Sequence, residues 1–427
     1  MNNALTAAVH TLGCKVNQCD AEALIARLTE AGIAVRPFDQ AADIYVINTC
    51  TVTHTGDKKS LQMVRRARRL NPSAFVAVCG CMPRSQADSM DKIKLAGADF
   101  VFDTRKPEEL LIKLEEILAD KAYSRAAIQA NDTTSERTRA FIKIQDGCDR
   151  FCAYCIVPYV RGPITSRPPS DILSEAAEHI RRGAQEIVLT GIQVAAYGYD
   201  TGGTTLPVLI KQLASQGPKR LRLSSIDPWA VDDEFLAVVA ESPTLCSHFH
   251  LSLQSGCDRT LARMNRRCTT AEYANAAEKL KAIRPNLALT TDIIVGFPGE
   301  TDDDFKESLH FAKEMGFSQI HVFEYSPRAG TPAASFPDQV PSQVKTARGA
   351  EMRTLAQSLK QQFLCTQIGR VVPVLFETAS REPSTWQGHT DNYCMVKASG
   401  ANLANTLMDV LITDITDDGL IGKPIVN

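Results

Sequence analysis

The sequence predicts an α/β protein in three parts: an N-terminal doubly wound parallel sheet, a central partial barrel of six strand–helix units, and a small C-terminal antiparallel β-barrel. With 427 residues, the chain is too long for one ordinary hydrophobic core. Up to about residue 328, short apolar runs alternate with helical patterns, which is typical of parallel sheets. From residue 366 onward, Gly and Asn turns separate the apolar runs, which favours a small antiparallel barrel.

Composition restricts the classes of protein to consider. The chain is 44% hydrophobic and 22% charged, as soluble globular proteins are. No uncharged apolar run approaches the roughly 18 residues that span a bilayer, and residues 1–10 lack the basic start and apolar core of a secretory signal. We therefore expect a cytoplasmic protein with no membrane partner. Because the formal net charge is −2, any RNA contact requires a local basic patch.

The first predicted domain covers residues 1–125. Its apolar runs predict strands over residues 7–11, 43–47, 75–78 and 100–102, and its amphipathic patterns predict helices over residues 21–31, 60–70 and 107–118.

Three of these strands end in a short turn that is followed by a cysteine: Cys14, Cys50 or Cys81. Ligands of doubly wound sheets bind just beyond the carboxyl ends of the strands, so the three thiols are expected to meet at a metal site. The alternative is three unrelated cysteines of the kind often buried in cores. Cys79 is a second candidate near the third strand end. We prefer Cys81, because it lies beyond Gly80, where the backbone can turn sharply.

The second group of thiols is the loop Cys148-Asp149-Arg150-Phe151-Cys152-Ala153-Tyr154-Cys155. Its spacing lets three sulfurs face one corner of a four-iron cluster and leaves one iron open, as catalysis requires. The alternative is a zinc loop that a distant cysteine, such as Cys246 or Cys257, completes. The chain has 13 cysteines, and in a reducing compartment clustered thiols indicate metal ligation before disulfides.

A polar linker, residues 126–138, leads to the central domain, residues 139–340. Strands are expected there over residues 140–144, 186–190, 220–223, 248–253, 287–295 and 318–323. Barrel chemistry takes place at the carboxyl ends of the strands, where polar residues such as Gln193, Ser225, Gln254 and Asp292 are found. The alternative is that these side chains only satisfy loop backbone groups.

A connecting helix over residues 341–364 leads to the C-terminal barrel, residues 365–427, with strands expected over residues 371–376, 393–397 and 408–413. The barrel contains four Lys and Arg against seven Asp and Glu, so strong electrostatic RNA binding by this domain alone is not expected.

Basic residues gather in two runs, and each run follows a predicted cluster or active-site loop. A phosphate backbone would lie there, although such runs are more often solvated helix faces. The first run is Lys58, Lys59, Arg65, Arg66, Arg68 and Arg69, and the second is Arg259, Arg263, Arg266 and Arg267.

The Cys148–Cys155 loop resembles the cluster loop of the radical S-adenosylmethionine superfamily. The segments at residues 11–17, 48–53 and 80–82, together with Gly296-Phe297-Pro298-Gly299-Glu300-Thr301, resemble the methylthiotransferases over essentially the whole chain. The resemblance implies two 4Fe–4S clusters, the first on Cys148, Cys152 and Cys155 and the auxiliary one on Cys14, Cys50 and Cys81. It makes Tyr154, Gln193, Ser225, Gln254 and Asp292 candidates to contact S-adenosylmethionine or substrate. It also implies that the last domain is the small RNA-binding barrel called TRAM.

Residues 12–17 and 51–57 look most like the family branch that methylthiolates C2 of N6-threonylcarbamoyladenosine beside the anticodon of tRNA. The resemblance thus implies tRNA as substrate and a low-potential electron donor such as flavodoxin or ferredoxin. Other readings stay open: the branch acting on isopentenyladenosine, the branch acting on a ribosomal-protein aspartate, and a non-catalytic iron–sulfur RNA-binding sensor.

Overall fold

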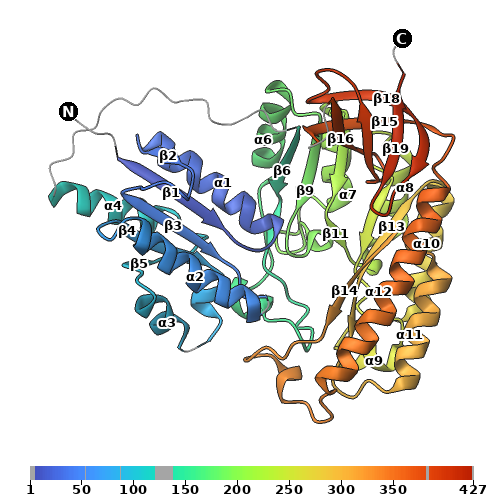
Figure 1. Ribbon diagram of the computed structural model, residues 1–427, viewed down its shortest axis with the longest axis horizontal. Coiled ribbons are helices and arrows are strands. Elements are labelled where there is room, and N and C mark those ends of the chain that lie inside the picture. Colours follow the sequence, from blue (N-terminus) through green and yellow to red (C-terminus); the bar gives the residue numbers. More distant parts are fainter. Residues whose placement is uncertain (1–4, 53, 87, 121–137, 381–383, 426–427) are drawn as a thin grey trace. The chain divides into compact units, whose positions relative to one another are not determined.

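The computed structural model describes residues 5–52, 54–86, 88–120, 138–380 and 384–425 (Figure 1). It divides into two compact units. The first comprises Met1–Ser135, Gly147–Pro163 and Ser326–Ala334, and the second comprises Glu136–Asp146, Ile164–Tyr325 and Ser335–Asn427. The loop with the second group of thiols therefore belongs to the first unit. The polar linker stretch at residues 131–137 lies outside the described residues, and the five-part division of the chain stays a prediction.

The first unit contains a five-stranded parallel sheet with the strand order β2-β1-β3-β4-β5, as expected for a doubly wound fold. Its elements are β1 (Thr6–Thr11), α1 (Lys15–Glu30), β2 (Ala34–Arg36), β3 (Ile44–Thr49), α2 (His54–Leu70), β4 (Phe75–Gly80), η1 (Met82–Arg84), α3 (Ser89–Leu95), β5 (Phe100–Val101), α4 (Glu108–Asp120) and α5 (Val157–Arg161).

Helices cover both faces of this sheet. Val46 of β3 packs in one core with Leu24 of α1 and Leu110 of α4. Its neighbour Ile47 packs in the other core with Val64 of α2. Because both faces are buried, the central strands read as continuous apolar runs, which explains why the sequence revealed them.

The helices begin earlier than the apolar periodicity predicts. Helix α1 starts at Lys15 and α2 at His54, directly after the turns that hold Cys14 and Cys50. Their first turns are polar, so no apolar repeat marks them. The three-residue edge strand β2 and the seven-residue helix α3 were not predicted, because both are too short to show a period.

The second unit contains the predicted partial barrel. Parallel strands form one sheet in the order β10-β9-β6 and a second in the order β11-β12-β13-β14, and Ser224 separates β10 from β11. The elements are β6 (Arg139–Lys143), β7 (Gln145–Asp146), β8 (Thr165–Ser166), α6 (Pro169–Arg181), β9 (Glu186–Thr190), η2 (Val194–Ala196), α7 (Leu206–Ser215), β10 (Arg220–Leu223), β11 (Ser225–Ile226), η3 (Pro228–Ala230), α8 (Asp233–Glu241), β12 (His248–Leu251), α9 (Asp258–Arg263), α10 (Thr270–Ile283), β13 (Ala288–Val295), α11 (Asp302–Met315), β14 (Gln319–Glu324) and α12 (Ser342–Cys365). The short helix η4 (Pro332–Ser335) lies mostly in the first unit.

A closed five-stranded barrel follows α12, in the order β15-β16-β17-β19-β18 (Figure 1). All of its pairings are antiparallel except β17 with β19, which is parallel. Its strands are β15 (Val371–Ala379), β16 (Thr385–Thr390), β17 (Met395–Ser399), β18 (Thr406–Ile415) and β19 (Leu420–Pro424). Strands β16 and β19 were missed, because their sequences TWQGHT and LIGKP lack a sustained alternation of apolar and polar residues.

Buried charges join this small barrel to the partial barrel within the second unit. Arg222 of β10 donates to both carboxylate oxygens of Glu186 of β9, at 2.7 and 3.0 Å, and to the carbonyl of Asp391, at 3.0 Å. Its guanidinium also lies 4.7 Å from the centre of the Tyr393 ring. Among the described residues, no helix is both long enough and apolar enough to cross a bilayer.

Candidate active site

Three neighbouring strands of the first unit present the first group of thiols. Strand β3 lies between β1 and β4, and Cys14, Cys50 and Cys81 follow the carboxyl ends of these three strands. Gly13 has a φ of 103°, and a Cβ atom added there would lie 2.8 Å from the sulfur of Cys50. The turn before Cys14 is thus pressed against Cys50, so the structure brings these strand ends together as the sequence predicted.

The competing thiol, Cys79, lies elsewhere. It is inside β4, only 1% exposed, and it packs in the apolar core with Ala7 and Val46. Burial raises the pKa of its thiol to about 12. Cys81 follows Gly80, whose φ is 95°, and packs beside Ile156. It therefore lies just beyond the carboxyl end of β4 and not in the core that contains Cys79.

An asparagine fixes the turns around these thiols. Asn17 donates from its side-chain nitrogen to the carbonyl of Leu12, at 2.6 Å, and to that of Thr49, at 3.1 Å. Asn48 donates in return to the carbonyl of Asn17, at 2.9 Å. These bonds link the end of β1, the start of α1 and the end of β3 into one rigid turn.

Arg161 places a positive charge among the same thiols. Its guanidinium donates to the side-chain oxygen of Asn17 and lies 3.3 Å from the carboxylate of Asp20. Burial raises the pKa of Cys81 to about 11, and the charge and hydrogen bond of Arg161 oppose that rise. The pKa of Cys50 is also raised by burial, again with an opposing contribution from Arg161. The arginine therefore favours the thiolate form of these cysteines.

A second arginine binds the loop after Cys50. Arg328 donates to the hydroxyl of Thr51 and forms an ion pair of 2.5 Å with Asp57, in the first turn of α2. The hydroxyl of Thr51 donates to Asp57 as well, at 2.7 Å. Arg328 is 4% exposed, so this clamp is shielded from solvent.

The second group of thiols lies in the loop that precedes α5. Strands β7 and β8 pair antiparallel at the neck of this loop. At its start Gly147 has a φ of 73°, and the N–H of Cys148 donates to the carbonyl of Gly162 at 3.1 Å. Cys152 is buried, while Cys148, Tyr154 and Cys155 are partly exposed. The three cysteines thus lie in one short segment between β7 and α5, and their role as cluster ligands stays a prediction.

The remaining predicted residues lie in the partial barrel of the second unit, two of them after strands and two within strands. Gln193 is 4% exposed and follows β9, and Ser225 is the first residue of β11. Gln254 has a φ of 83°, and its N–H donates to the carbonyl of Asp292 at 2.9 Å. Asp292 lies within β13, so of these four residues Gln193 and Gln254 follow the carboxyl ends of strands.

Two histidines beside Asp292 were not predicted. His250 of β12 lies 3.3 Å from the carboxylate of Asp292, and His321 lies on the next strand, β14. One ligand atom from each of the three residues falls within 4.8 Å of the others. The signal in the sequence was weak, because the three residues are on three different strands and each stands alone among apolar neighbours.

Comparisons with known proteins agree with this geometry. The chain matches the family model described as "Radical SAM superfamily" over residues 142–312 and the one described as "Uncharacterized protein family UPF0004" over residues 6–103. It is 40% identical, over 92% of its own length and 90% of the relative, to the threonylcarbamoyladenosine tRNA methylthiotransferase MtaB of Bacillus subtilis. The chain belongs to the radical S-adenosylmethionine methylthiotransferases.

A related branch is also similar to this methylthiotransferase. The tRNA-2-methylthio-N(6)-dimethylallyladenosine synthase of Neisseria meningitidis is 34% identical, over 97% of this chain and 98% of the relative. Among solved structures, the radical S-adenosylmethionine methyltransferase TsrM of Kitasatospora setae has a TM-score of 0.59 and covers 78% of this chain and 77% of its own. At 13% identity, that likeness supports the fold alone. Membership of the radical superfamily implies S-adenosylmethionine and a 4Fe–4S cluster as cofactors.

Three arginines of the second basic run form contacts with other parts of the second unit. Arg259 pairs with Asp304, Arg263 donates to the carbonyl of Pro298 at 3.0 Å, and Arg266 donates to the carbonyl of Ser252 at 2.7 Å. Such bonds hold loops of the barrel together and leave these guanidinium groups less able to bind phosphate.

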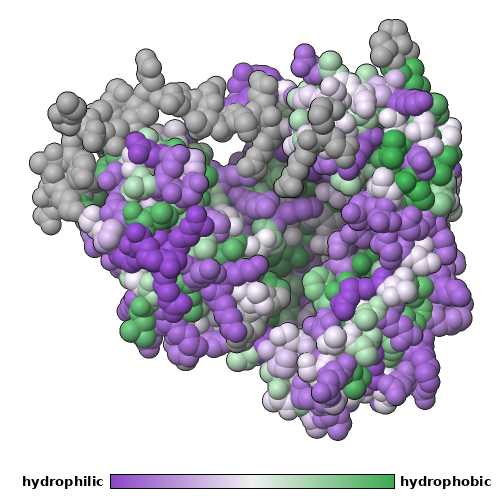
Figure 2. Space-filling model, in the orientation of Figure 1, coloured by the Kyte–Doolittle hydropathy of each residue, from purple (hydrophilic) through white to green (hydrophobic). Residues whose placement is uncertain are grey.

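The first basic run, on α2, is different. Arg68 is again structural, because it donates to the carbonyls of Gly97 and Ala74 and pairs with Asp99. The other five residues are exposed on one face of the helix, and no ion pair to them is found within the described part of the chain: Lys58, Lys59, Arg65, Arg66 and Arg69. We call these five the α2 stripe. Figure 2 shows strongly hydrophilic side chains over the part of the first unit where α2 lies.

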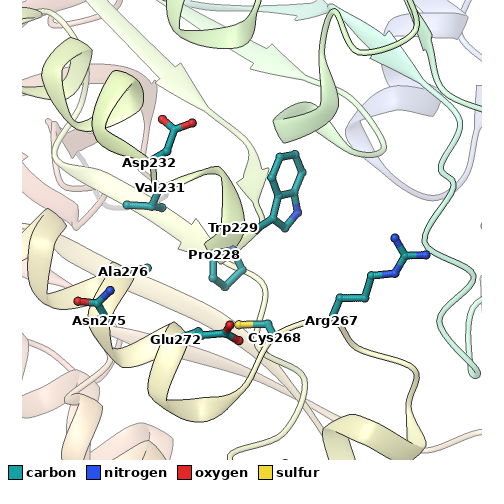
Figure 3. A pocket seen from close by; sticks show the side chains of 9 residues that line it. All are labelled: Pro228, Trp229, Val231, Asp232, Arg267, Cys268, Glu272, Asn275 and Ala276. Atoms are coloured by element: carbon teal, nitrogen blue, oxygen red, sulfur yellow. The ribbon is translucent and has the colours of Figure 1, made fainter.

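A small pocket on the outer side of the barrel does not coincide with the predicted site. It lies between η3 and the first turn of α10, has a volume of about 220 Å³, and includes Pro228, Cys268 and Glu272 in its lining (Figure 3). Pockets for drug-sized ligands occupy roughly 300–1,000 Å³, so this one is too small for S-adenosylmethionine. None of the predicted cofactor residues lines it.

Proposed function

We propose that this methylthiotransferase acts on tRNA and converts N6-threonylcarbamoyladenosine beside the anticodon to its 2-methylthio derivative. The observation that carries the proposal is the pairing of two cysteine triplets in one compact unit. Three ligands for a four-iron cluster leave one iron open, and two such sites suit a reaction that needs both a radical and a sulfur source. Relatives named for threonylcarbamoyladenosine, at 32–40% identity, support the choice of substrate.

In this proposal, Cys148, Cys152 and Cys155 hold the cluster that binds S-adenosylmethionine. When bound and reduced, that cluster supplies the electron that cleaves S-adenosylmethionine. The chain contributes a loop whose two ends are joined by the bond from the Cys148 N–H to the Gly162 carbonyl. Tyr154 lies within the loop and is assigned to the cofactor. The side chains of Gln193, Ser225, Gln254 and Asp292 are assigned to S-adenosylmethionine or substrate from the barrel's strand ends.

Cys14, Cys50 and Cys81 are proposed to hold the second, auxiliary 4Fe–4S cluster, the source of the inserted sulfur. Thiolates are the soft ligands that iron–sulfur clusters prefer. The contact of Gly13 with the Cys50 sulfur and the nearby charge of Arg161 support this assignment, because the site is compact and its negative charge is compensated. Arg161 and Asn17 orient the turns and stabilise the thiolates.

The proposed macromolecular partner is tRNA, and the α2 stripe is the surface that we assign to its phosphates. Five exposed cations on one helix face supply the local positive charge that phosphate binding requires, whereas the C-terminal barrel is acidic. A cytoplasmic flavodoxin or ferredoxin is proposed as the electron donor.

Mass spectrometry of tRNA nucleosides from a deletion strain tests the proposal. The 2-methylthio derivative of threonylcarbamoyladenosine should disappear, while that of dimethylallyladenosine remains, and a plasmid-borne copy should restore the loss. The reverse pattern would assign the chain to the dimethylallyl branch, and no change in either nucleoside would reject tRNA as the substrate.

A further inference from the structure

On neighbouring strands of the partial barrel, the side chains that face the inside are polar, and those that face the surrounding helices are apolar. Along β12, Phe249 and Leu251 are 1% and 0% exposed and pack in the core shared with the helices. Side chains alternate along a strand, so His250 points to the inner face. By the same alternation, Ile293 of β13 is in the core, and Asp292 is on the inner face.

Strand β14 continues the pattern. Ile320 is 7% exposed and belongs to the core, so the next residue, His321, lies on the inner face and is exposed. The strand register aligns these residues, because Asp292 is the partner of His321 and Ser225 is the partner of His250. Four adjacent strands therefore present one row of polar side chains to the inner face, which consists of Ser225, His250, Asp292 and His321.

The row has defined hydrogen-bonding geometry. His250 is held between the hydroxyl of Thr290, 3.0 Å from its Nδ1, and the carboxylate of Asp292, 3.3 Å from its Nε2. The side chains of His250 and Asp292 are 15% and 30% exposed, so a ligand can reach them. Placing imidazoles and a carboxylate on an inward face is costly unless they have polar partners. Thr290 and Asp292 give His250 such partners, and a polar ligand would add hydrogen bonds at the Asp292 carboxylate and at the exposed His321 imidazole.

The two families of relatives differ in the group that their substrates carry on N6. The threonylcarbamoyl group has a carboxylate, a hydroxyl and carbamoyl N–H groups, whereas the dimethylallyl group is a hydrocarbon. Imidazole N–H groups donate to a carboxylate, and the Asp292 carboxylate accepts from a hydroxyl or an N–H. The row can thus form hydrogen bonds with the threonylcarbamoyl group, whereas the dimethylallyl group can form none with it.

We propose that His250, Asp292 and His321 bind the threonylcarbamoyl group and so select that nucleoside over dimethylallyladenosine. The inference rests on the proposed function and narrows it to a substrate-recognition site. A site built for hydrogen bonds discriminates strongly against an analogue that lacks the polar group, because the apolar group displaces water from the site's polar atoms without replacing those hydrogen bonds.

Three synthetic anticodon stem-loop RNAs test this selection. They share one sequence and carry adenosine, threonylcarbamoyladenosine or dimethylallyladenosine at the target position. The variants are His321→Leu, His250→Leu and the conservative His321→Gln, which keeps an N–H donor. Gln319→Ala is the matched control, since Gln319 is exposed on the same strand, two residues before His321. Affinity is measured by fluorescence anisotropy, which needs no turnover, and kcat/KM by nucleoside mass spectrometry.

The wild-type protein should prefer the threonylcarbamoyl RNA. In His321→Leu and His250→Leu, the preference over dimethylallyl RNA should fall by about 10- to 100-fold, largely through affinity and KM. His321→Gln should recover part of the preference, and Gln319→Ala should match the wild type.

Two results would overturn the inference: equal losses on the two modified RNAs, or an unchanged preference in both leucine variants. A wild-type protein that modifies only dimethylallyl RNA would instead refute the proposed function itself, before any variant is compared.

Discussion

Arg161 lies with its guanidinium 3.3 Å from the carboxylate of Asp20, and both side chains are more than nine-tenths buried. Arg161 ends the helix that follows the Cys148–Cys155 loop, and Asp20 is in the helix that follows Cys14. One ion pair therefore joins the two chain segments that bear the two groups of thiols, within one compact unit.

Removal of Arg161 should weaken both the fold and the auxiliary site. Arg161→Leu leaves Asp20 buried without its partner, and such losses cost about 3–5 kcal/mol. We expect a lower midpoint of urea unfolding and less iron at the site of Cys14, Cys50 and Cys81. Anaerobic unfolding and iron analysis measure both effects.

The double variant Arg161→Leu with Asp20→Leu checks the cause. It should be less destabilised than the sum of the two single variants, because no lone charge is left buried. Arg105→Ala is the control, since Arg105 is more exposed, pairs with Asp103, and donates to Arg161 at the backbone carbonyl and not at the side chain. Strict additivity of the two single changes would contradict a coupled pair.

Cys79 and Cys81 should respond differently to substitution. Cys81→Ala should lose the auxiliary cluster and all methylthiolation, while 5′-deoxyadenosine is still released from S-adenosylmethionine. Cys79→Ala should keep the cluster and most activity, because Cys79 is a core residue and its loss costs only packing. Iron content and nucleoside analysis of the two variants separate the possibilities. Retained methylthiolation in Cys81→Ala, with loss in Cys79→Ala, would reverse the assignment.

The triple change of Cys148, Cys152 and Cys155 to Ala should abolish cleavage of S-adenosylmethionine. About half of the iron should stay, held by the other triplet. Release of 5′-deoxyadenosine by reduced, reconstituted protein is the decisive measurement. Cleavage that survives the triple change would show that these thiols do not hold the radical cluster.

The fold was largely predictable because its signals are local. Continuous apolar runs marked β3 and β4, and the strand-end positions of Cys14, Cys50 and Cys81 followed from them. The missed elements are short or irregular: β2 has three residues, and β16 has no regular apolar alternation. In such segments, pairing with neighbouring strands decides the conformation, and the sequence of the segment alone contains little of that information.

Contacts between distant segments could not be predicted. Arg161 meets Asp20, and Arg328 meets Asp57, across more than a hundred residues. The histidine row depends on the register of four strands, which no single strand reveals. For the same reason, the sequence did not distinguish arginines without an ion pair among the described residues from Arg68 and Arg259, which pair with Asp99 and Asp304.

The α2 stripe should account for part of the salt dependence of tRNA binding. Replacing Arg66 and Arg69 with Ala should weaken binding and flatten the slope of log K against log salt by roughly one to two units. The reason is that each phosphate contact releases counterions when it forms. Filter binding over a salt series measures the slope.

Two controls accompany this variant. The double change of Arg181 and Arg182 to Ala removes the same charge from α6, where both residues pair with Glu178, and should leave the slope unchanged. Arg68→Ala should lower stability instead, because Arg68 bonds to backbone carbonyls of its own unit. An unchanged slope in the α2 variant would make the stripe an ordinary solvated face.

The buried pair of Glu186 and Arg222 should make the stability of the second unit depend on pH. Burial raises the pKa of Glu186, but the charge and hydrogen bonds of Arg222, together with the charges of Arg139 and Arg220, outweigh it and hold that pKa below the ordinary 4.5. A carboxylate with a lowered pKa stabilises the fold above its unfolded pKa, and this contribution is lost as the pH falls below about 4.5. Glu186→Gln should therefore cost about 3–5 kcal/mol near neutral pH, since Arg222 is left buried without a counter-charge. The difference from wild type should shrink as the pH falls below 4.5.

Urea unfolding followed by tryptophan fluorescence reports on this unit, because both tryptophans, Trp229 and Trp386, lie within it. Glu178→Gln, on the exposed surface of α6, should change the stability little, and a pH-independent deficit in Glu186→Gln would show that the loss is one of packing rather than of charge.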